Sequence, residues 1–404
     1  MIKAVAPKSA DILVLGGGPA GLTAALAMAQ CGFSVICVEP NPPTAQSRDA
    51  MAMRTAAVLL PSIALLREIG VWDEVEPIAT PLRTMTVIDG DAAGPQKTVP
   101  FQSKEIDQSD FGSTIAVEAL RTALMARIRS PSVPSGVTVI ESTARDIIRR
   151  DDDAITIMEN GDLIKTALII AADGRKSPAR EQAGITVRTT RYNQTAITFL
   201  VTHDQAHNGE SIEIYRTGGP FTFVPHHKIG DRDCSAVVWM ESHAKANALM
   251  ALSIDEFSQA ATARSMNARG PLQLASERRC WPMQSMLADR FHAKRLALIA
   301  ETAHIVPPIG AQGLNMSLKD VVALRQSICN AREAGKDIGS VEVLEHYTRR
   351  RWPDVAARVA GASLLNVAAI GAVRPLRDLR LGTLSAIHNI APLRRFAMKF
   401  GLGG

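Results

Sequence analysis

A glycine-rich turn between a short strand and a helix constrains this chain more than any other feature of its sequence. Residues 11–15 (DILVL) are largely apolar and predict a strand that is buried on both faces. The glycines of residues 16–21 (GGGPAG) interrupt this strand, and residues 19–30 have the alanine- and leucine-rich pattern of a helix. A second apolar run, residues 33–38, ends at Glu39. A strand, a glycine turn, a helix, a strand and an acidic residue in this order predict a βαβ unit that binds a dinucleotide.

The residues of this unit have separate physical roles. Gly16 allows the tight turn, Gly18 lets the backbone approach a pyrophosphate, and Gly21 lets the helix pack closely on the sheet. Ala20 lies in the same turn, where the first N–H groups of the helix point towards the phosphates. Glu39 is placed to accept hydrogen bonds from a ribose diol. The alternative is a turn without a ligand, but such a turn needs neither three glycines nor the terminal Glu. NAD and FAD both contain adenosine diphosphate, so the unit alone does not choose between them.

The composition excludes several classes of protein. The 404 residues allow two or three domains, and 46% hydrophobic with 21% charged residues is typical of a globular protein, so disorder is not expected as the main state. With 10 Phe, 4 Trp and 3 Tyr, the chain has few rings for stacking on bases. We therefore expect no nucleic acid as a partner.

The cysteines and the uncharged runs indicate the cellular compartment of the protein. Five cysteines, an odd number without metal-like spacing, favour a reducing compartment and no metal site. Two uncharged runs imitate membrane segments, but residues 12–38 contain the glycine turn and residues 359–373 are shorter than the roughly 20 residues that a spanning helix needs. We expect no transmembrane segment and a cytoplasmic location.

Two more strand ends carry polar motifs. Residues 168–171 predict a strand that leads into ADGRKSPAR, with Asp173 and Gly174. Residues 296–300 predict another strand, which leads into ETAHIVPPIGAQGLN ahead of a helix that is expected to start near Met316. A carboxylate at the end of that strand can bind a ligand hydroxyl, and the N-terminus of the helix can stabilise a negative charge on a bound ligand.

These motifs together resemble those of the single-component flavin-dependent aromatic hydroxylases, which have the fold of para-hydroxybenzoate hydroxylase. PPIGAQGLN followed by SLKD, with LREIGVW at residues 66–72, is similar to the ubiquinone-biosynthesis branch of this superfamily. The resemblance implies that FAD is bound and that NAD(P)H is a transient co-substrate, because no second GxGxxG motif follows a strand. The cofactor-binding residues that it implies are Gly16, Gly18, Ala20, Gly21, Glu39, Arg54, Arg121, Asp173, Gly174, Glu301, Pro308, Gly310, Gly313, Leu314 and Asn315.

Some of these assignments have alternatives or departures. Arg54 and Arg121 are both in settings where a solvated helix residue is an equal interpretation. Ala300 and Glu301 stand where the family most often has Gly-Asp, so the acceptor chemistry is kept while the carboxylate moves by one methylene. His304 follows in the family's place and is predicted to be a structural hydrogen-bonding residue rather than an acid or base.

The organisation predicted for the chain is a Rossmann-like α/β FAD-binding domain with an inserted, mostly antiparallel β domain and C-terminal helices. Short alternating runs between residues 186 and 282 predict the antiparallel sheet, to which residues 82–96 are expected to contribute. The predicted FAD-binding domain comprises residues 1–75, 106–185 and 283–340, the substrate domain comprises 76–105 and 186–282, and the C-terminal helical region comprises 341–404.

The function that the resemblance implies is hydroxylation of a prenylated phenol in ubiquinone biosynthesis, through a flavin C4a-hydroperoxide. One alternative is a hydroxylase of small soluble aromatics, and another is a non-catalytic partner that retains FAD in a quinone-biosynthesis complex. No catalytic base is assigned, because Tyr192, Tyr215 and His226 are each most simply strand residues.

The C-terminal segment, residues 372–404, has six cations and one anion, which accounts for the whole formal net charge of +5. Its leucines, isoleucines and phenylalanines have a spacing that gives short helices an apolar stripe beside a basic one. We expect it to contact the inner face of a membrane or a partner of the quinone pathway. The alternative is that the apolar stripe packs on the FAD-binding domain.

Overall fold

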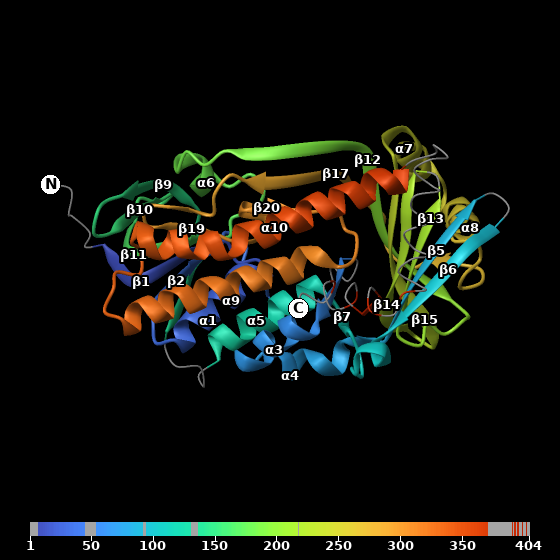
Figure 1. The fold of residues 1–404 in the computed structure, drawn as a ribbon, viewed down its shortest axis with the longest axis horizontal. Coiled ribbons are helices and arrows are strands. Elements are labelled where there is room, and N and C mark those ends of the chain that lie inside the picture. Colours follow the sequence, from blue (N-terminus) through green and yellow to red (C-terminus); the bar gives the residue numbers. More distant parts are fainter. Residues whose placement is uncertain are drawn as a thin grey trace.

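The structure is a computed structural model, and it describes residues 7–44, 54–91, 94–130, 136–216 and 218–370, with 390, 392, 394, 395, 398 and 401. Within these residues it has two large sheets joined side by side, and one long helix, α10 (Val341–Ile370), runs across both (Figure 1).

The first sheet has a parallel core that begins at the N-terminus of the chain. Its described strands have the order β18-β19-β11-β1-β2-β8, and the hairpin of β9 and β10 adds to β11. β1 lies between β2 and β11 and is parallel to both, with Leu15 opposite Val38 and Ala171. The strands are β1 (Lys8–Leu15), β2 (Val35–Val38), β8 (Val137–Ile140), β9 (Ala144–Arg149), β10 (Ala154–Met158), β11 (Leu163–Ala171), β18 (His292–Ala293) and β19 (Leu296–Leu298).

Helices pack on this sheet through a continuous apolar core. α1 (Pro19–Gln30) is buried along most of its length and contacts both α5 (Val117–Arg129) and α9 (Gln312–Glu333). The core includes the strands β1, β2 and β11 and the small side chains of α1, which let helix and sheet approach closely. The other described helices are α3 (Leu60–Glu68), α4 (Trp72–Val75), α6 (Pro178–Gln182), α7 (His243–Ala251) and α8 (Ile254–Arg264), with short 3₁₀ turns η1 (Glu76–Ile78), η2 (Ser103–Ile106) and η3 (Ala300–Thr302).

The second sheet is mostly antiparallel. Its described strands have the order β20-β17-β12-β15-β14-β13-β5-β6, and β16 adds to β12. β12 and β17 pair along one side of the molecule and connect the two halves (Figure 1). The strands are β5 (Thr84–Asp91), β6 (Gly94–Gln102), β12 (Val187–His203), β13 (Glu210–Arg216), β14 (Gly219–Ile229), β15 (Arg232–Ser242), β16 (Gln273–Leu274), β17 (Arg279–Ala288) and β20 (His304–Ile305).

One face of the second sheet has its own aromatic core. Phe199 packs edge-on against Phe221 and against Phe257 of α8, and Phe221 packs edge-on against Trp239. Residues of α7 and α8 belong to the same core, so these helices cover this face. A small third sheet, made of β3 (Thr55–Leu59), β4 (Thr80–Leu82) and β7 (Gly112–Ala116), lies between the two halves and contacts β14.

The predicted fold class is confirmed, and two local boundaries differ from expectation. The strand predicted for residues 296–300 is β19, which ends at Leu298 because the chain turns into η3. The following helix begins at Gln312, four residues before the expected Met316. The domain boundaries stay a prediction.

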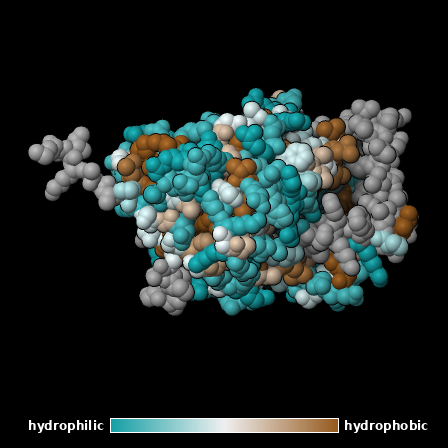
Figure 2. All heavy atoms as spheres, turned by 60° about the vertical axis from the view of Figure 1, so that its left-hand side comes forward, coloured by the Kyte–Doolittle hydropathy of each residue, from teal (hydrophilic) through white to brown (hydrophobic). Residues whose placement is uncertain are grey.

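The surface in Figure 2 is mainly hydrophilic, and apolar residues form separate groups on it. Among the described residues, no helix is long and apolar enough to span a membrane.

Candidate active site

Two glycines of the first turn are required by packing. Gly16 has φ +103°, and a Cβ atom there would lie 2.3 Å from the carbonyl oxygen of Ala172. A Cβ atom on Gly21 would lie 1.9 Å from the carbonyl oxygen of Gly16. Neither distance is tolerable, so both glycines hold α1 tightly against the ends of β1 and β11.

Gly18 is a glycine for a different reason. Its φ of −71° is open to any residue, and no atom lies within 4 Å of a Cβ atom built on it. α1 begins here with Pro19 at its first position and without a side-chain cap, so its first N–H groups have no side-chain acceptor. An uncapped helix start beside open space fits a phosphate group.

Glu39, which follows β2, and Arg121 of α5 meet at this turn. The Glu39 carboxylate accepts hydrogen bonds from the N–H groups of Gly17 (2.6 Å) and Asn41 (2.9 Å). The Arg121 guanidinium lies 3.2 Å from Glu39 Oε1 and donates to the carbonyl oxygens of Gly17 (2.8 Å) and Asn41 (2.6 Å). The side chain of Arg121 is therefore largely buried in the cradle, and the solvated alternative does not describe it.

The loop after β11 contacts the loop after β19. Thr302 Oγ1 donates to Asp173 Oδ1 (3.1 Å) and accepts from the Gly174 N–H (3.2 Å), while Asp173 Oδ2 accepts from the Ala179 N–H (3.2 Å). Burial raises the pKa of Asp173 above its usual value. Gly174 has φ +87°, which favours glycine.

Glu301 precedes Thr302, the partner of Asp173, and has two basic neighbours. Its Oε1 is 3.4 Å from Arg54 Nη2, and its Oε2 is 3.7 Å from Arg175 Nε. The Glu301 side chain is 41% exposed, so it is accessible to a ligand. The structure thus brings the predicted residues Arg54 and Glu301 together, 247 positions apart in sequence.

A buried ionic cluster supports the Glu301 turn from below. Ala300 has φ +58° and donates its N–H to Asp320 Oδ2 (3.0 Å). The Asp320 carboxylate is fully buried and also contacts His304 Nε2 (2.7 Å) and Arg351 Nε (2.9 Å). Sequence reasoning identified His304 as structural, and this position agrees, but it missed Asp320 as the partner. Burial alone would raise the pKa of Asp320, yet His304 and Arg351 together hold it below its usual value.

The start of α9 has unusual backbone geometry. Gly310 and Ala311 both have positive φ, +65° and +56°, and the helix begins at the next residue without a side-chain cap. Gly313 has open space beside it, as Gly18 has. Pro308 is exposed and Leu314 is partly buried. These backbone N–H groups again fit an electron-rich ligand edge.

Asn315 has a structural role that the sequence did not reveal. Its Oδ1 accepts from the Leu59 N–H (2.9 Å), and its Nδ2 donates to the carbonyl oxygens of Ala57 (2.8 Å) and Ala311 (2.7 Å). The side chain therefore ties β3 to the start of α9, and only its backbone is available for a cofactor.

An apolar cavity of about 350 Å³ lies between the start of α9, α10 and the second sheet. Ile309, Gly310 and Gln312 border it on one side, and Met85, Val87, Phe101, Phe111, Leu365 and Met398 are among its apolar walls. Its polar groups include Glu213 and Tyr215 of β13, and Tyr215 donates a hydrogen bond to Glu213 Oε1. Tyr215 was among the strand residues considered from sequence, whereas Glu213 was missed. The alternation of SIEIYRT puts both side chains on one face of the strand, which was the available signal.

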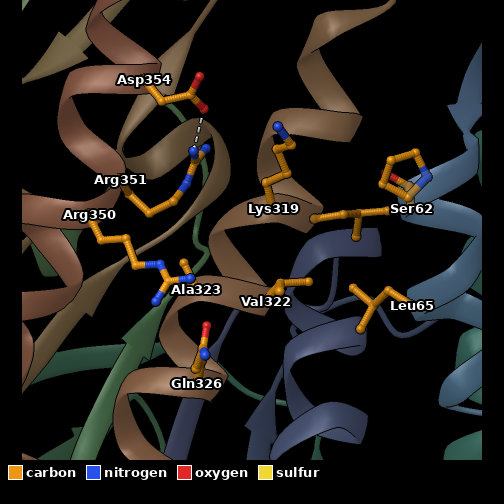
Figure 3. A pocket seen from close by; sticks show the side chains of 11 residues that line it. Ser62, Leu65, Lys319, Val322, Ala323, Gln326, Arg350, Arg351 and Asp354 are labelled. Carbon is orange, nitrogen blue, oxygen red and sulfur yellow. Dashed lines mark hydrogen bonds and ion pairs between the residues drawn. The ribbon is translucent and has the colours of Figure 1, made fainter. Parts of the chain in front are cut away.

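A second hollow, of about 420 Å³, lies between α3, α9 and α10 (Figure 3). Lys319, Arg350 and Arg351 line it, and Arg351 Nη1 is 2.5 Å from Asp354 Oδ2. It is basic, whereas the cavity at β13 is apolar. Among the described residues no group of His, Cys, Asp and Glu side chains has the arrangement of a metal site.

The residues present fit FAD. Gly18 and Gly313 leave space at two uncapped helix starts, Glu39 and Arg121 line the first, and Glu301 lies at the intervening strand end. A dinucleotide cradle beside an apolar cavity is the arrangement of an FAD-dependent oxidoreductase with an apolar substrate.

The comparisons agree. The family model described as "FAD binding domain" matches residues 9–362, and the chain belongs to this family, in its ubiquinone-hydroxylase branch. It is 30% identical to ubiquinone hydroxylase UbiL of Rhodospirillum rubrum over 98% of this chain and 90% of that protein. It is 28% identical to 3-demethoxyubiquinol 3-hydroxylase of Escherichia coli over 97% of this chain and 98% of that protein. Among solved structures, p-nitrophenol 4-monooxygenase PnpA of Pseudomonas putida shares the fold, with a TM-score of 0.77 and 18% identity over 98% of this chain and 99% of that chain.

Proposed function

We propose that this enzyme hydroxylates the aromatic ring of a prenylated phenol in ubiquinone biosynthesis, with O₂ and NAD(P)H as co-substrates. The observation that carries the proposal is the apolar cavity beside the Gly310–Gln312 segment. Its walls are mainly aliphatic and aromatic, which suits a ring with a hydrocarbon tail. The names of the relatives from Rhodospirillum rubrum and Escherichia coli support the same pathway.

The chain's residues bind and orient the cofactor. FAD supplies the redox chemistry, because it accepts a hydride and activates oxygen. Gly18 and the start of α1 would hold the pyrophosphate, and Glu39 the adenosine ribose, with Arg121 fixing the Glu39 carboxylate. Glu301 would hold the ribitol, and the N–H groups of Gly313, Leu314 and Asn315 the flavin edge. Asp173 and Gly174 complete this set, which stays a prediction at the level of single residues.

The experiment is turnover by the purified FAD-containing protein with NADH or NADPH and ¹⁸O₂. The substrates are a phenol with one short prenyl tail and, separately, small phenols without a tail. We expect ¹⁸O in the prenylated product and NAD(P)H consumption matched to product. Hydroxylation of the tail-free phenols alone would support the hydroxylase of soluble aromatics, and retained FAD without any product would support the non-catalytic partner. Mass spectrometry of the quinone intermediates in a deletion strain would give the ring position.

We also propose that the C-terminal segment holds the enzyme at an anionic membrane surface. Most of residues 372–404 lie outside the described residues, but Leu364 and Val367, near the end of α10, are 71% and 47% exposed. Arg394 donates a hydrogen bond to Glu105 (2.7 Å) and is therefore not available for lipid. We assign the contact with lipid to the other cations of the segment.

The test of this contact is binding to vesicles that contain anionic lipid. Each cation near such a surface contributes about 1 kcal/mol, so replacing Arg374, Arg377 and Arg380 together by Ser should weaken binding at low salt by about 100-fold. Truncation is unsuitable because Met398 and Gly401 line the cavity. Equal vesicle binding by wild type and by the triple variant would contradict a membrane contact through these cations. Binding to another protein of the pathway in place of vesicles would identify the alternative partner.

A further inference from the structure

We propose that Glu213 accepts the phenolic proton of the substrate and restricts the cavity to neutral phenols, excluding aromatic acids. This proposal rests on the proposed hydroxylation and names a residue and a substrate class for it. Tyr215 acts as a positioning residue for the Glu213 carboxylate.

The strand β13 presents these two side chains to the cavity. Ile212 and Ile214 are buried in the aromatic core on the other face of the sheet, so Glu213 and Tyr215 point the opposite way. Glu213 pairs in register with Val87 of β5, whose side chain also lines the cavity. A carboxylate therefore stands in a wall that is otherwise mainly apolar.

The partners of Glu213 keep it available for a proton. Tyr215 donates to Oε1, and among the described residues no cation pairs with Glu213. Arg358 lines the same cavity, but its guanidinium donates to Asp354 (2.9 Å) and Gln312 (2.9 Å). Asp89 is in register with Tyr215 on β5. Burial raises the pKa of Glu213, and the hydrogen bond from Tyr215 acts against this rise.

The proton transfer balances without an added reagent. The O–H bond of the phenol breaks as an O–H bond forms on the Glu213 carboxylate, and the electron pair stays on the phenolic oxygen. That pair enriches the ring carbon at which the new C–O bond forms. When the ring becomes aromatic again, the ring carbon loses its proton to solvent and Glu213 returns its proton to the phenolic oxygen. Glu213 ends in its starting state.

The same carboxylate selects against anions. A benzoate group bound near Glu213 would place two negative charges in one mainly apolar cavity, whose cation Arg358 is already paired with Asp354. Like charges strongly disfavour joint ionisation there. A neutral phenol has no such cost and gains the hydrogen bond to Glu213. We therefore expect the enzyme to discriminate between an alkylphenol and a hydroxybenzoate of similar size.

The test uses Glu213→Gln, Tyr215→Phe and a control, Glu277→Gln, whose carboxylate is 79% exposed and outside the cavity. Turnover of an alkylphenol by Glu213→Gln should fall 10²- to 10⁴-fold at neutral pH, the usual contribution of a general base. It should recover at high pH, or with a fluorinated phenol of low pKa, because such a phenol ionises without help. Tyr215→Phe should move the acidic limb of the rate profile to higher pH, since Glu213 loses its donor.

A binding measurement without turnover separates this role from the proposed function. With the oxidised, FAD-containing protein and no NAD(P)H, calorimetry should show that Glu213→Gln binds 4-hydroxybenzoate at least tenfold more tightly than wild type does, with alkylphenol affinity changed less. FAD content and melting temperature should match those of Glu277→Gln. Unchanged turnover, pH profile and acid discrimination in Glu213→Gln would overturn the assignment while the hydroxylase itself remains active. If wild type hydroxylates no phenol, the proposed function fails instead.

Discussion

Replacing Gly18 with Val should remove FAD binding while leaving the fold intact. Gly18 has extended backbone geometry, and no atom lies within 4 Å of its added Cβ, so Val fits the FAD-free protein. In the complex the same side chain would occupy the space for the pyrophosphate. FAD at 100 times its dissociation constant stabilises a protein by about 2.7 kcal/mol. With about 2.1 cal/mol/K of unfolding entropy for each of the 404 residues, this corresponds to a melting temperature higher by roughly 3 °C.

The assay compares melting of the FAD-free proteins with and without added FAD, and flavin absorbance after gel filtration. Wild type should gain the 3 °C, whereas Gly18→Val should melt like FAD-free wild type and stay colourless. Gly21→Ala is the matched control: its Cβ would lie 1.9 Å from the Gly16 carbonyl oxygen, so this variant should be destabilised even without FAD. A Gly18→Val protein with full FAD occupancy would refute the placement of the dinucleotide, and one as unstable as Gly21→Ala would show that Gly18 is a packing residue.

Three further predictions concern the Glu301 turn. Glu301→Gln keeps an acceptor oxygen and should weaken FAD only modestly, whereas Glu301→Ala should cost about 1–3 kcal/mol of FAD affinity by titration; a Gln variant with normal FAD but no hydroxylation would favour proton transfer instead. Ala300→Gly relieves the left-handed backbone but loses a buried methyl group, so its stability in urea should stay within about 1 kcal/mol of wild type; a loss above about 2 kcal/mol would contradict the strain at φ +58°. His304 and Arg351 depress the folded pKa of Asp320, so this carboxylate stabilises the fold above its unfolded pKa, near 4, and the contribution is lost as pH falls further. Asp320→Asn should therefore flatten the acid limb of a curve of unfolding free energy against pH. An unchanged acid limb would contradict this role of Asp320.

Local patterns predicted the parts of the site that are continuous in sequence. The βαβ unit was predictable because strand, glycine turn and helix follow one another, and α1 has the expected bounds, Pro19–Gln30. The start of α9 was not, because a Pro-Gly loop suggests irregular structure while Ala311 turns the chain directly into the helix. Alternation along β13 predicts that Glu213 lies on the opposite face from its neighbours Ile212 and Ile214. It does not predict which of the two faces meets the cavity, since that depends on how the two sheets are joined. Asp320 escaped notice because its partners His304 and Arg351 come from other elements.

The strand order of the first sheet also sets when the site can exist during synthesis. β1 is synthesised first but lies between β2 and β11 in the sheet. The other edge of β11 pairs with β19, which comes much later in the chain. At about 5–20 residues per second, the gap between the ends of β1 and β19 corresponds to roughly 15–60 s on the ribosome. During this time the nascent chain carries the glycine turn and Glu39 without Glu301 or α9. On the proposed contacts of FAD with Glu301 and α9, chains that terminate before α9 should leave the ribosome without FAD.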